Sequence, residues 1–449
     1  MLRRPRSYDP ASIHPVPTNV PKLARSVSAY YTVESDNHSK ARINLLKNPS
    51  YLGHYTSRVN RTYNEDRYYA GVLKLPVGSS LTSKYVRQKF THHDRQVFNF
   101  AVFDGHGGSE CSQFLQDHLA EYVENCDLSS GTALRDLYRK NVGGYWRAWG
   151  PELDRYVSRL TAVDDFQLRL PLSFLKADYE FSEKFERAGS TATSVYLYSD
   201  EESISANGDG TNLIGKTAAA NDSEDAVDYS RTPKAFWDQD QVTTLVVAHV
   251  GDTRCILCDH HGNVHQLTTN HHPSTSVENT RLKRYATSFF TDSFGEERFG
   301  SFANTRAFGD FAAKAKGITA EPEIVECRIG DKRKIKSLSS TYPRHIKTFT
   351  GDEAFLVLMS DGVTEMISDQ EVVDLVINTA NKAGSGRGTP QDAAKEIVHY
   401  AAAVGGDDNA TCMVIRLSGW GKWDTWYDRT APRREEKLSS YSVRAPRRT

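Results

Sequence analysis

Apolar runs of strand length recur along the chain and predict a set of buried β-strands. The runs are rich in β-branched and aromatic residues, and several end where an aspartate stands beside a glycine. All are far too short to cross a bilayer as a helix, so the pattern predicts no membrane insertion. The predicted strands are residues 98–103, 192–198, 242–250, 255–257, 355–360 and 410–417.

Helical patterns fill segments between these strands. Ser368, followed three positions later by Glu371, forms a capping box that predicts a helix from residue 369. Strand clusters followed by helices, rather than strict alternation, are typical of layered α+β folds with mainly antiparallel sheets. The predicted helices are residues 108–125, 164–187, 369–382 and 390–404.

Composition narrows the class of protein. The chain has 449 residues, of which 38% are hydrophobic and 25% are charged, as in globular proteins. Its formal net charge of −1 gives no overall attraction to nucleic acid or anionic lipid. Six scattered cysteines indicate a reducing compartment. Cys255 and Cys258 are spaced like a redox or zinc pair, but their apolar surroundings favour plain packing in a strand.

One folded core is predicted from residue 53 to residue 418, with a segment on each side. Residues 1–45 are basic, poor in acids and contain five prolines. They are expected to be flexible, either as an organelle-targeting presequence or as a tail without an address. Residues 419–449 hold three tryptophans and then repeated arginines. These tryptophans either pack on the core or meet a partner.

Two charged insertions interrupt the predicted core. Residues 200–241 contain ten acids against three bases, which predicts a mobile acidic loop. Residues 328–347 contain seven Arg and Lys residues against one acid. The favoured interpretation of this basic loop is a solvated charge run, and steering of phosphorylated segments is the alternative.

Five acidic motifs stand at predicted strand ends or turns and together predict a metal site. Each is weak alone, because Asp-Gly and Asp-Asn are common turn pairs. Converging carboxylates repel one another unless cations neutralise them, and an oxygen-only ligand set selects Mg²⁺ or Mn²⁺. The motifs are Arg61-Thr-Tyr-Asn-Glu-Asp66, Asp104-Gly-His-Gly-Gly108, Gly251-Asp-Thr-Arg254, Ser360-Asp-Gly362 and Asp407-Asp-Asn409.

A pair of such ions would support hydrolysis of a phosphate ester. Two ions about 3.5–4 Å apart can share a bridging water, lower its pKa and hold a phosphate for in-line attack. The reaction also needs a cation for the phosphate oxygens and an acid for the leaving oxygen, and Arg61 and His106 are the candidates. The alternatives are a surface ion pair for Arg61 and a backbone-bonded turn residue for His106.

These motifs resemble those of the metal-dependent type 2C serine/threonine protein phosphatases. The matches run in family order from Arg61 to Asn409 and cover nearly all of the predicted core. The further matching segments are Gly189-Ser-Thr-Ala192, Val250-Gly-Asp-Thr-Arg254, Leu267-Thr-Thr-Asn-His-His-Pro273, Thr305-Arg-Ala-Phe-Gly-Asp310 and Ala320-Glu-Pro-Glu323.

The resemblance implies a four-layer αββα sandwich of two antiparallel sheets flanked by helices. It also implies two Mg²⁺ or Mn²⁺ ions at one end of the sandwich. Asp104 would bridge both ions and the Gly105 carbonyl would bind one of them. Asp361 and Asp408 would complete the shell of the first ion.

Further roles follow from the same resemblance. Glu65 would hold the second ion, partly through water, with Asp66 in the outer shell. Arg61 would bind the substrate phosphate and His106 would be the general acid. No phosphoenzyme is expected, because the attacking group is water.

The chain also departs from the family pattern. Glu365 stands four residues after Asp361, where the family usually has Asp, and Thr364 replaces the usual Trp. Asn270 replaces the usual Asp. The resemblance places Asp252 near a more weakly held third ion, which Glu365 could also reach, while a hairpin turn is the alternative for Asp252. The histidine pairs at 260–261 and 271–272 are interpreted as solvated loop residues rather than zinc ligands.

The sequence therefore predicts a monomeric, Mg²⁺/Mn²⁺-dependent phosphatase that acts on phosphoserine and phosphothreonine in proteins. The alternative is a catalytically inactive pseudophosphatase that acts as a binding module. Glu365 is similar to the pyruvate dehydrogenase phosphatase branch of the family. With the basic N-terminal segment it indicates a mitochondrial location, and cytosol or nucleus is the alternative.

Overall fold

The structure of the chain is a computed structural model. It describes residues 29–34, 40–75, 95–148, 165–182, 187–199, 235–283, 289–293, 295, 297–300, 302–338 and 346–444. Residues 1–28 of the basic N-terminal segment and residues 200–234 of the acidic insertion lie outside this part of the chain. The presequence and the mobile acidic loop therefore stay predictions.

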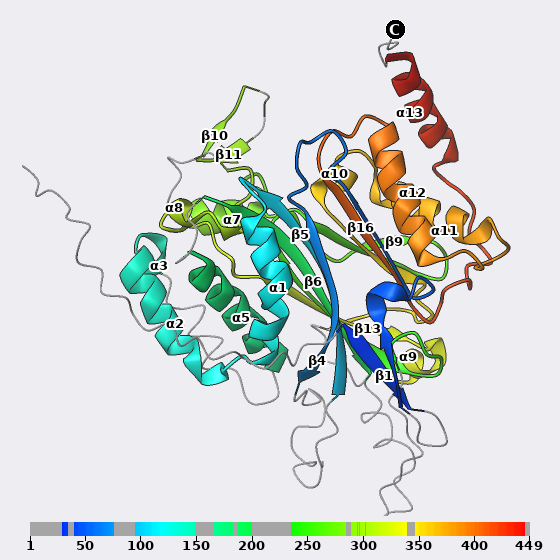
Figure 1. Cartoon of the computed structure of the whole chain (residues 1–449), viewed down its shortest axis with the longest axis horizontal. Coiled ribbons are helices and arrows are strands. Elements are labelled where there is room, and N and C mark those ends of the chain that lie inside the picture. Colours follow the sequence, from blue (N-terminus) through cyan, green and yellow to red (C-terminus); the bar gives the residue numbers. More distant parts are fainter. Residues whose placement is uncertain are drawn as a thin grey trace, which may run out of the picture.

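Two β-sheets pack face to face, and helices cover both outer faces, which confirms the predicted four-layer sandwich (Figure 1). In spatial order, the first sheet contains β14 (Lys347–Thr348), β13 (Glu323–Gly330), β7 (Val242–Val250), β6 (Gly189–Ser199), β5 (Arg95–His106) and β4 (Arg67–Leu75), with β12 (Phe308–Gly309) beside β6. The second contains β3 (Leu52–Ser57), β16 (Ala410–Arg416), β15 (Phe355–Met359), β8 (Arg254–Cys258) and β9 (Val264–Gln266). Every pairing in the two sheets is antiparallel except that between β13 and β14.

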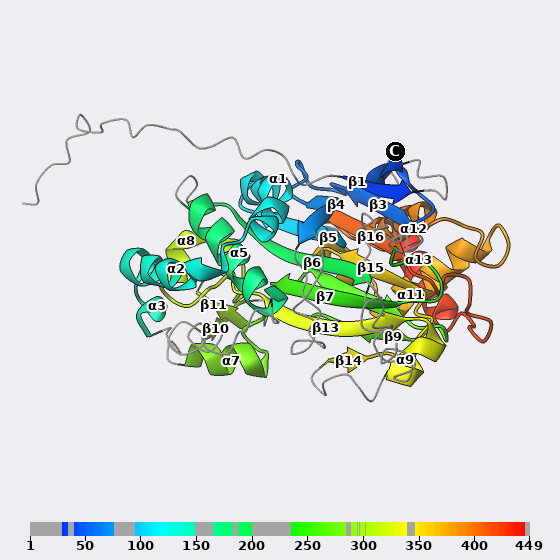
Figure 2. The same cartoon turned by 90° about the horizontal axis from the view of Figure 1, so that it is seen from below.

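Four of the five longest helices in the described part of the chain lie where the apolar patterns predict them, and the fifth, near the C-terminus, was not predicted. Figure 2 shows α1 (Glu110–Glu124) and α5 (Asp165–Ser182) beside the first sheet, and α11 (Asp369–Asn381) and α12 (Pro390–Ala403) beside the second. The predicted capping box of Ser368 and Glu371 is present at the start of α11. Shorter helices are α2 (Gly131–Leu137), α3 (Tyr145–Ala148), α7 (Ser276–Leu282), α8 (Phe311–Lys314), α9 (Lys332–Leu338) and α10 (Asp361–Thr364), with single turns at Leu45–Lys47, Leu128–Ser130 and Tyr138–Val142.

Strand β5 is buried on both faces, which explains its continuous apolar run. Alternate residues pack either toward α1 and α5 or into the space between the sheets. The first set includes Val97, Ala101 and Phe103, and the second includes Phe98, Phe100 and Val102. The strand continues to His106, three residues beyond the prediction, and the turn follows at Gly107 and Gly108, which both have positive φ.

The cysteines at 255 and 258 confirm the prediction of plain packing. Cys255 packs between the two sheets, whereas Cys258 packs under α11 and α12 on the opposite face of β8. Both are free thiols and fully buried. Because they face opposite sides of one strand, they cannot form a joint ligand or redox pair.

Part of the N-terminal segment is ordered, so the expectation of flexibility up to residue 45 is wrong there. Strands β1 (Tyr30–Glu34) and β2 (Lys40–Asn44) pair antiparallel. The Tyr31 side chain is buried, and its ring centroid lies 5.0 Å from that of Trp237. Trp237 and the buried Phe236 belong to the last residues of the predicted acidic insertion, which therefore ends in the core.

The tryptophans of the C-terminal segment pack on the core. Trp420 and Trp423 are buried, and both rings contact that of Phe355 in β15. Helix α13 (Ala431–Arg444) follows and lies beside α12, where the Tyr400 hydroxyl donates to the Arg434 carbonyl at 3.3 Å. The first of the two predicted alternatives for these tryptophans is thus the one observed.

The basic segment 328–347 is not a loop throughout. It contains the end of β13, helix α9 and the start of β14. Strand β13 begins opposite His249 and ends opposite Val242 in β7, so α9 lies at the far end of the sheet from Asp252. Figure 1 shows the same separation between α9 and α10. The position argues against the alternative that this segment steers substrates toward the acidic motifs.

Among the described residues, no helix combines the length and the apolar character needed to span a membrane.

Candidate metal centre

Three aspartates converge at one end of the sandwich. Asp104 lies near the end of β5, Asp252 lies in the turn after β7, and Asp361 is the first residue of α10 after β15. One carboxylate oxygen from each lies within 4.8 Å of those from the other two. The structure therefore brings together two predicted ligands of the metal pair and the residue assigned to a third ion, and it draws them from both sheets.

Close packing fixes the backbone around Asp104. The Asp361 N–H donates to Asp104 Oδ2 at 3.3 Å. A Cβ on Gly105 would lie 2.5 Å from the Glu65 carbonyl oxygen and 2.8 Å from Ser112 Oγ. Ser112 also donates a hydrogen bond to that carbonyl. Glycine at 105 is therefore required by the close approach of two backbone segments.

The cluster fits a cation because its acids are removed from water and repel one another. Burial, followed by the charges of Asp361, Asp66 and Asp252, raises the pKa of Asp104 well above its ordinary value. Burial and then the charge of Asp252 raise the pKa of Asp361 in the same way. Such acids would take up protons unless a cation neutralises them, and their oxygen-only donor set suits Mg²⁺ or Mn²⁺.

Asp66 lies beside Asp104 and Ser360 and gives a second sign that the site suits a cation. Its side chain is 2% exposed, and burial is the main cause that raises its pKa to about 6. Its Oδ2 accepts a hydrogen bond from Ser360 Oγ at 2.8 Å. Its buried Oδ1 has no hydrogen-bond partner within the described part of the chain, and a buried oxygen in that state fits a cation or a polar ligand held by one.

Other predicted ligands lie outside the group of three aspartates. In the described ranges, none of Glu65, Glu365 and Asp408 has a carboxylate oxygen within 4.8 Å of all three members. The charge of Asp408 nevertheless helps to raise the pKa of Asp66 and of Asp361. Glu365 acts on Asp361 in the same way from one helical turn away. Asp408 and Glu365 are thus close enough to add to the negative field of the centre, and the charge of Glu65 helps to raise the pKa of His106 beside it.

Arg61 lies beside the centre and pairs with Asp408. Its Nη2 is 2.7 Å from Asp408 Oδ2, and the Arg61 side chain is 56% exposed. Asn409 holds the loop that carries it, because Asn409 Oδ1 accepts from the Glu65 N–H at 2.8 Å and its Nδ2 donates to the Tyr63 carbonyl at 2.9 Å. The sequence reasoning gave Asn409 no role, although its place beside Asp408 was an available signal.

His106 is held by a carboxylate. Its Nε2 lies 2.8 Å from Oδ2 of Asp310, the residue before α8. Burial alone would lower the pKa of His106, but the hydrogen bond that the ring makes to Asp310 and the charge of Asp310 outweigh burial and raise that pKa. The His106 ring is therefore hydrogen-bonded to a carboxylate and not, as in the predicted alternative, to the backbone. Asp310 belongs to a recognised motif, yet nothing in its spacing pointed to His106.

His271 is buried, so its interpretation as a solvated loop residue is wrong. Its Nδ1 accepts a hydrogen bond from the Gly251 N–H at 2.9 Å, and its ring stacks on that of His249 with centroids 4.8 Å apart. Burial lowers the pKa of both rings, which keeps them neutral. The pair fixes the backbone immediately before Asp252, a role that a turn motif does not reveal.

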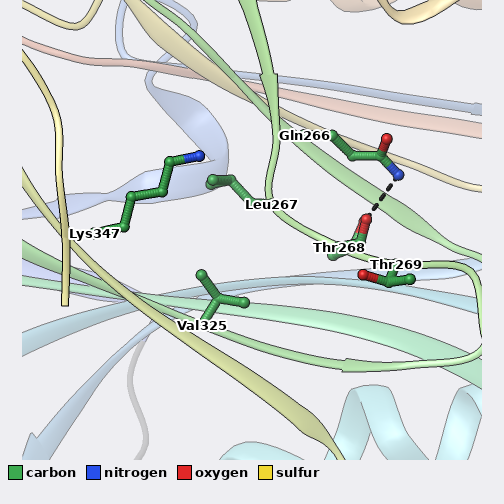
Figure 3. Close-up of a pocket in the computed structure, with 6 residues that line it drawn as sticks. All are labelled: Gln266, Leu267, Thr268, Thr269, Val325 and Lys347. Atoms are coloured by element: carbon green, nitrogen blue, oxygen red, sulfur yellow. Dashed lines mark hydrogen bonds between the residues drawn. The ribbon is translucent and has the colours of Figure 1, made fainter. Parts of the chain in front are cut away.

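A pocket of about 380 Å³ opens elsewhere, between the end of β9 with the residues that follow it and strands β13 and β14 (Figure 3). Its lining residues are Gln266, Leu267, Thr268, Thr269, Val325 and Lys347. None of them is a carboxylate, so this pocket is separate from the aspartate cluster. Figure 3 shows the Lys347 and Leu267 side chains extending toward one another across it.

An αββα sandwich with aspartates from both sheets, an arginine and a histidine at one end defines a hydrolase of the protein phosphatase class. The sequence profile described as "Protein phosphatase 2C" matches residues 234–338 and 328–410. Protein phosphatase 2C homolog 4 of Schizosaccharomyces pombe is 34% identical over 403 residues, which cover 89% of this chain and 88% of that protein. The chain therefore belongs to the protein phosphatase 2C family of metal-dependent protein serine/threonine phosphatases, as the motifs predicted.

Two further likenesses were found. Protein phosphatase 1K, mitochondrial, of Xenopus laevis is 24% identical over 341 residues, which cover 75% of this chain and 65% of that protein. Among solved structures, a phosphatase from a pathogenic strain of Toxoplasma gondii is 16% identical with a TM-score of 0.48, and the match covers 87% of this chain and 96% of that one.

Proposed function

We propose that this chain hydrolyses phosphoserine and phosphothreonine in proteins with two Mg²⁺ or Mn²⁺ ions, and a weaker third, bound at the aspartate cluster. The observation that carries the proposal is the convergence of Asp104, Asp252 and Asp361 within 4.8 Å. When bound, the ions would neutralise these acids, activate a water and hold the phosphate. Asp104, Asp361 and Asp408 with the Gly105 carbonyl would hold them, together with Glu65 and the outer Asp66.

Asp252 and Glu365 would bind the third ion. Asp252 Oδ2 already accepts a hydrogen bond from Asn304 Nδ2 at 2.8 Å, which orients its carboxylate. The hydrogen bond fixes one oxygen and leaves the other for a cation.

Arg61 would bind the substrate phosphate. Its exposed guanidinium presents several donors in a planar fork, which matches phosphate oxygens. The pairing with Asp408 holds the side chain at the centre before substrate arrives. A bound phosphate would then share the guanidinium with Asp408.

His106 would protonate the leaving oxygen. Its side chain is 42% exposed at the end of β5, so a substrate can reach it. The pairing with Asp310 raises its pKa and so favours the protonated ring, which is the form an acid needs. Water would attack directly, so no residue of the chain would become phosphorylated.

Purified full-length protein tests the proposal. With Mn²⁺ it is expected to hydrolyse a phosphothreonine peptide, to lose activity with EDTA, and to regain it with metal. Asp104→Asn and Asp361→Asn are each expected to lower kcat by at least about 10²-fold. Asp352→Asn is the matched control, because Asp352 pairs with Lys422 before the start of β15, at the end of that strand away from Asp361. Equal activity in the wild type and in both ligand variants would show that the aspartate cluster does not carry the reaction. No activity, with no tight divalent site by calorimetry, would favour the inactive binding module.

We also propose a mitochondrial location and a monomeric state. The basic N-terminal segment, Glu365 and the likeness to a relative named as mitochondrial support the location. Because β1 packs on the core from Tyr30, a removed presequence would have to end before it. Imaging of a fusion with and without residues 1–28 tests the location, and identical diffuse signals would refute it. Light scattering after gel filtration tests for a mass of 50.3 kDa.

A further inference from the structure

Asp310 and His106 form a hydrogen-bonded pair although 204 positions separate them in the chain. The Asp310 side chain is 6% exposed, whereas that of His106 is 42% exposed. The carboxylate is thus anchored inside the protein and the ring stands at the open side of the site. An ionised carboxylate can only accept a hydrogen bond, so Nε2 of His106 must carry the proton.

A buried network holds Asp310 in place. Its backbone is left-handed, with φ 49° and ψ 41°, a conformation that costs free energy at a residue other than glycine. The preceding Gly309 N–H donates to Asp178 Oδ1 at 2.8 Å. Asp178 Oδ2 also accepts from the Tyr138 hydroxyl at 2.9 Å and pairs with Lys314 Nζ at 3.0 Å, and all three side chains are almost completely buried.

Gly189 leaves the space that the pair occupies. A Cβ at this position would lie 2.2 Å from Nε2 of His106 and 2.7 Å from Oδ2 of Asp310. In the sheet, Gly189 is the direct partner of His106 in β5 and of Gly309 in β12. Three features therefore support this one hydrogen bond. They are the absence of a Cβ at Gly189, the left-handed backbone of Asp310 and the buried hydrogen bonds of Asp178.

We propose that Asp310 is the positioning residue for His106 in the reaction, an inference that rests on the proposed function. By accepting the Nε2 proton, Asp310 leaves Nδ1 as the nitrogen that delivers a proton. As the phosphorus–oxygen bond breaks, the Nδ1 proton passes to the departing seryl or threonyl oxygen. The oxygen of the attacking water joins phosphorus, one of its protons goes to solvent, and the ring regains one from solvent.

The role predicts a dependence on the leaving group. A seryl or threonyl oxygen is a poor leaving group and needs a proton as it departs, whereas p-nitrophenolate departs as an anion unaided. Loss of the Asp310 carboxylate should therefore slow the two kinds of substrate unequally. Damage to the metal centre or to the fold would slow both alike.

Asp310→Asn is the test, because Asn has the same shape and tolerates the left-handed backbone. With Mn²⁺, kcat for a phosphothreonine peptide is expected to fall by about 10²-fold or more, and kcat for p-nitrophenyl phosphate by less than about 3-fold. KM for both substrates and the Mn²⁺ affinity by calorimetry are expected to stay at the wild-type values. The control Asp352→Asn makes the same replacement at a residue with φ 57° and is expected to match the wild type.

A double variant separates positioning from a structural role. Asp310→Asn is expected to add no further loss to His106→Gln, since its effect passes through that ring. If Asp310→Asn fails to fold, Gly189→Ala breaks the same pair from β6 and is expected to give the same unequal losses. Equal losses on both substrates, or losses that add to those of His106→Gln, would overturn the inference while the proposed function stands. An inactive wild-type protein would overturn both.

Discussion

Asn409 joins the end of the folded core to its beginning, because its Oδ1 accepts a hydrogen bond from the N–H of Glu65 at 2.8 Å. Its amide also donates to the carbonyls of Tyr63 and Arg58, at 2.9 Å and 3.3 Å. One side chain therefore makes three of the hydrogen bonds that position the loop carrying Arg61 and Glu65. The loop has no regular secondary structure, so it depends on such side-chain contacts, which include the one from Ser112 to the Glu65 carbonyl.

Asn409→Ala is expected to weaken metal binding by about 10–100-fold, because the groups around a metal site depend on their supporting hydrogen bonds. The free energy of unfolding should fall by about 2 kcal/mol. Calorimetry with Mn²⁺ and urea unfolding measure the two effects. Asn48→Ala removes a hydrogen bond to Tyr31 near β1 and serves as the control, with unchanged metal affinity. Equal Mn²⁺ affinity in both variants would contradict the role given to Asn409.

The metal-free protein is expected to be less stable at pH 7 than at pH 5 through its buried acids. Asp66 has a pKa of about 6 in the folded state against an ordinary value of 3.8. A folded-state pKa above the unfolded one means that the folded state binds more protons in this range, so the free energy of unfolding falls as pH rises. For this group the fall is about 3 kcal/mol over the whole titration, of which about 1.3 kcal/mol lies between pH 5 and pH 7. Urea unfolding with EDTA at both pH values checks the sign.

Two comparisons isolate this effect from other titrating groups. Asp66→Asn should flatten the dependence on pH, and Mn²⁺ should restore stability at pH 7 by binding only the folded, ionised form. If the metal-free protein has the same free energy of unfolding at both pH values, burial does not raise the pKa of these acids.

Arg61→Ala is expected to weaken the binding of phosphate. A charged hydrogen bond of this kind is worth about 1.5–3 kcal/mol, so kcat/KM should fall by about 10–100-fold. Inorganic phosphate should also inhibit the variant less strongly, which a product-inhibition series measures. Arg61→Lys keeps the charge but loses the planar fork and is expected to lie between the two. If phosphate inhibits the Arg61→Ala variant as strongly as the wild type, Arg61 serves only as a surface ion-pair partner of Asp408.

Trp423→Ala is expected to lower the free energy of unfolding by about 3–5 kcal/mol, because it empties a buried site on the outer face of the second sheet. The ring packs on Trp420 and Phe355, and its Nε1 donates to Asn381 Oδ1 at 3.2 Å. Tyr427→Ala, at a ring that is 67% exposed, should change stability by less than about 0.5 kcal/mol. Thermal unfolding of both variants decides whether this segment is part of the fold.

Sequence reasoning located the strands that are buried on both faces, since their apolar runs are continuous. Strand β15, for example, sends Phe355, Val357 and Met359 toward α11 and α12 and its other residues toward the first sheet. It did not locate β13, because Glu323, Glu326 and Arg328 interrupt the apolar pattern of a strand near the sheet edge. The hydrophobic pattern of a strand arises from the burial of its side chains, so a partly exposed strand such as β13 shows only a weak pattern.

The aspartates of the centre could be predicted because each follows a recognisable apolar run, and the ends of these three strands, β5 and β7 of the first sheet and β15 of the second, meet at one end of the sandwich. Contacts between residues far apart in the chain could not be predicted. The pairing of Asp310 with His106 and the contact of His271 with Gly251 arise only when loops fold over the sheet edge. Such side chains look like ordinary turn residues until the fold supplies their neighbours.

The aspartate cluster has one further consequence, because Asp104 lies in β5 of the first sheet, Asp361 follows β15 of the second, and Asp252 lies in the turn that joins β7 of the first sheet to β8 of the second. A divalent ion held there would link the two halves of the sandwich, each of which is one sheet with its covering helices. Neither half could retain partial catalysis alone, and enzymatic turnover would report directly on whether the halves have docked. Recovery of activity during refolding should therefore lag behind recovery of β-structure in either layer.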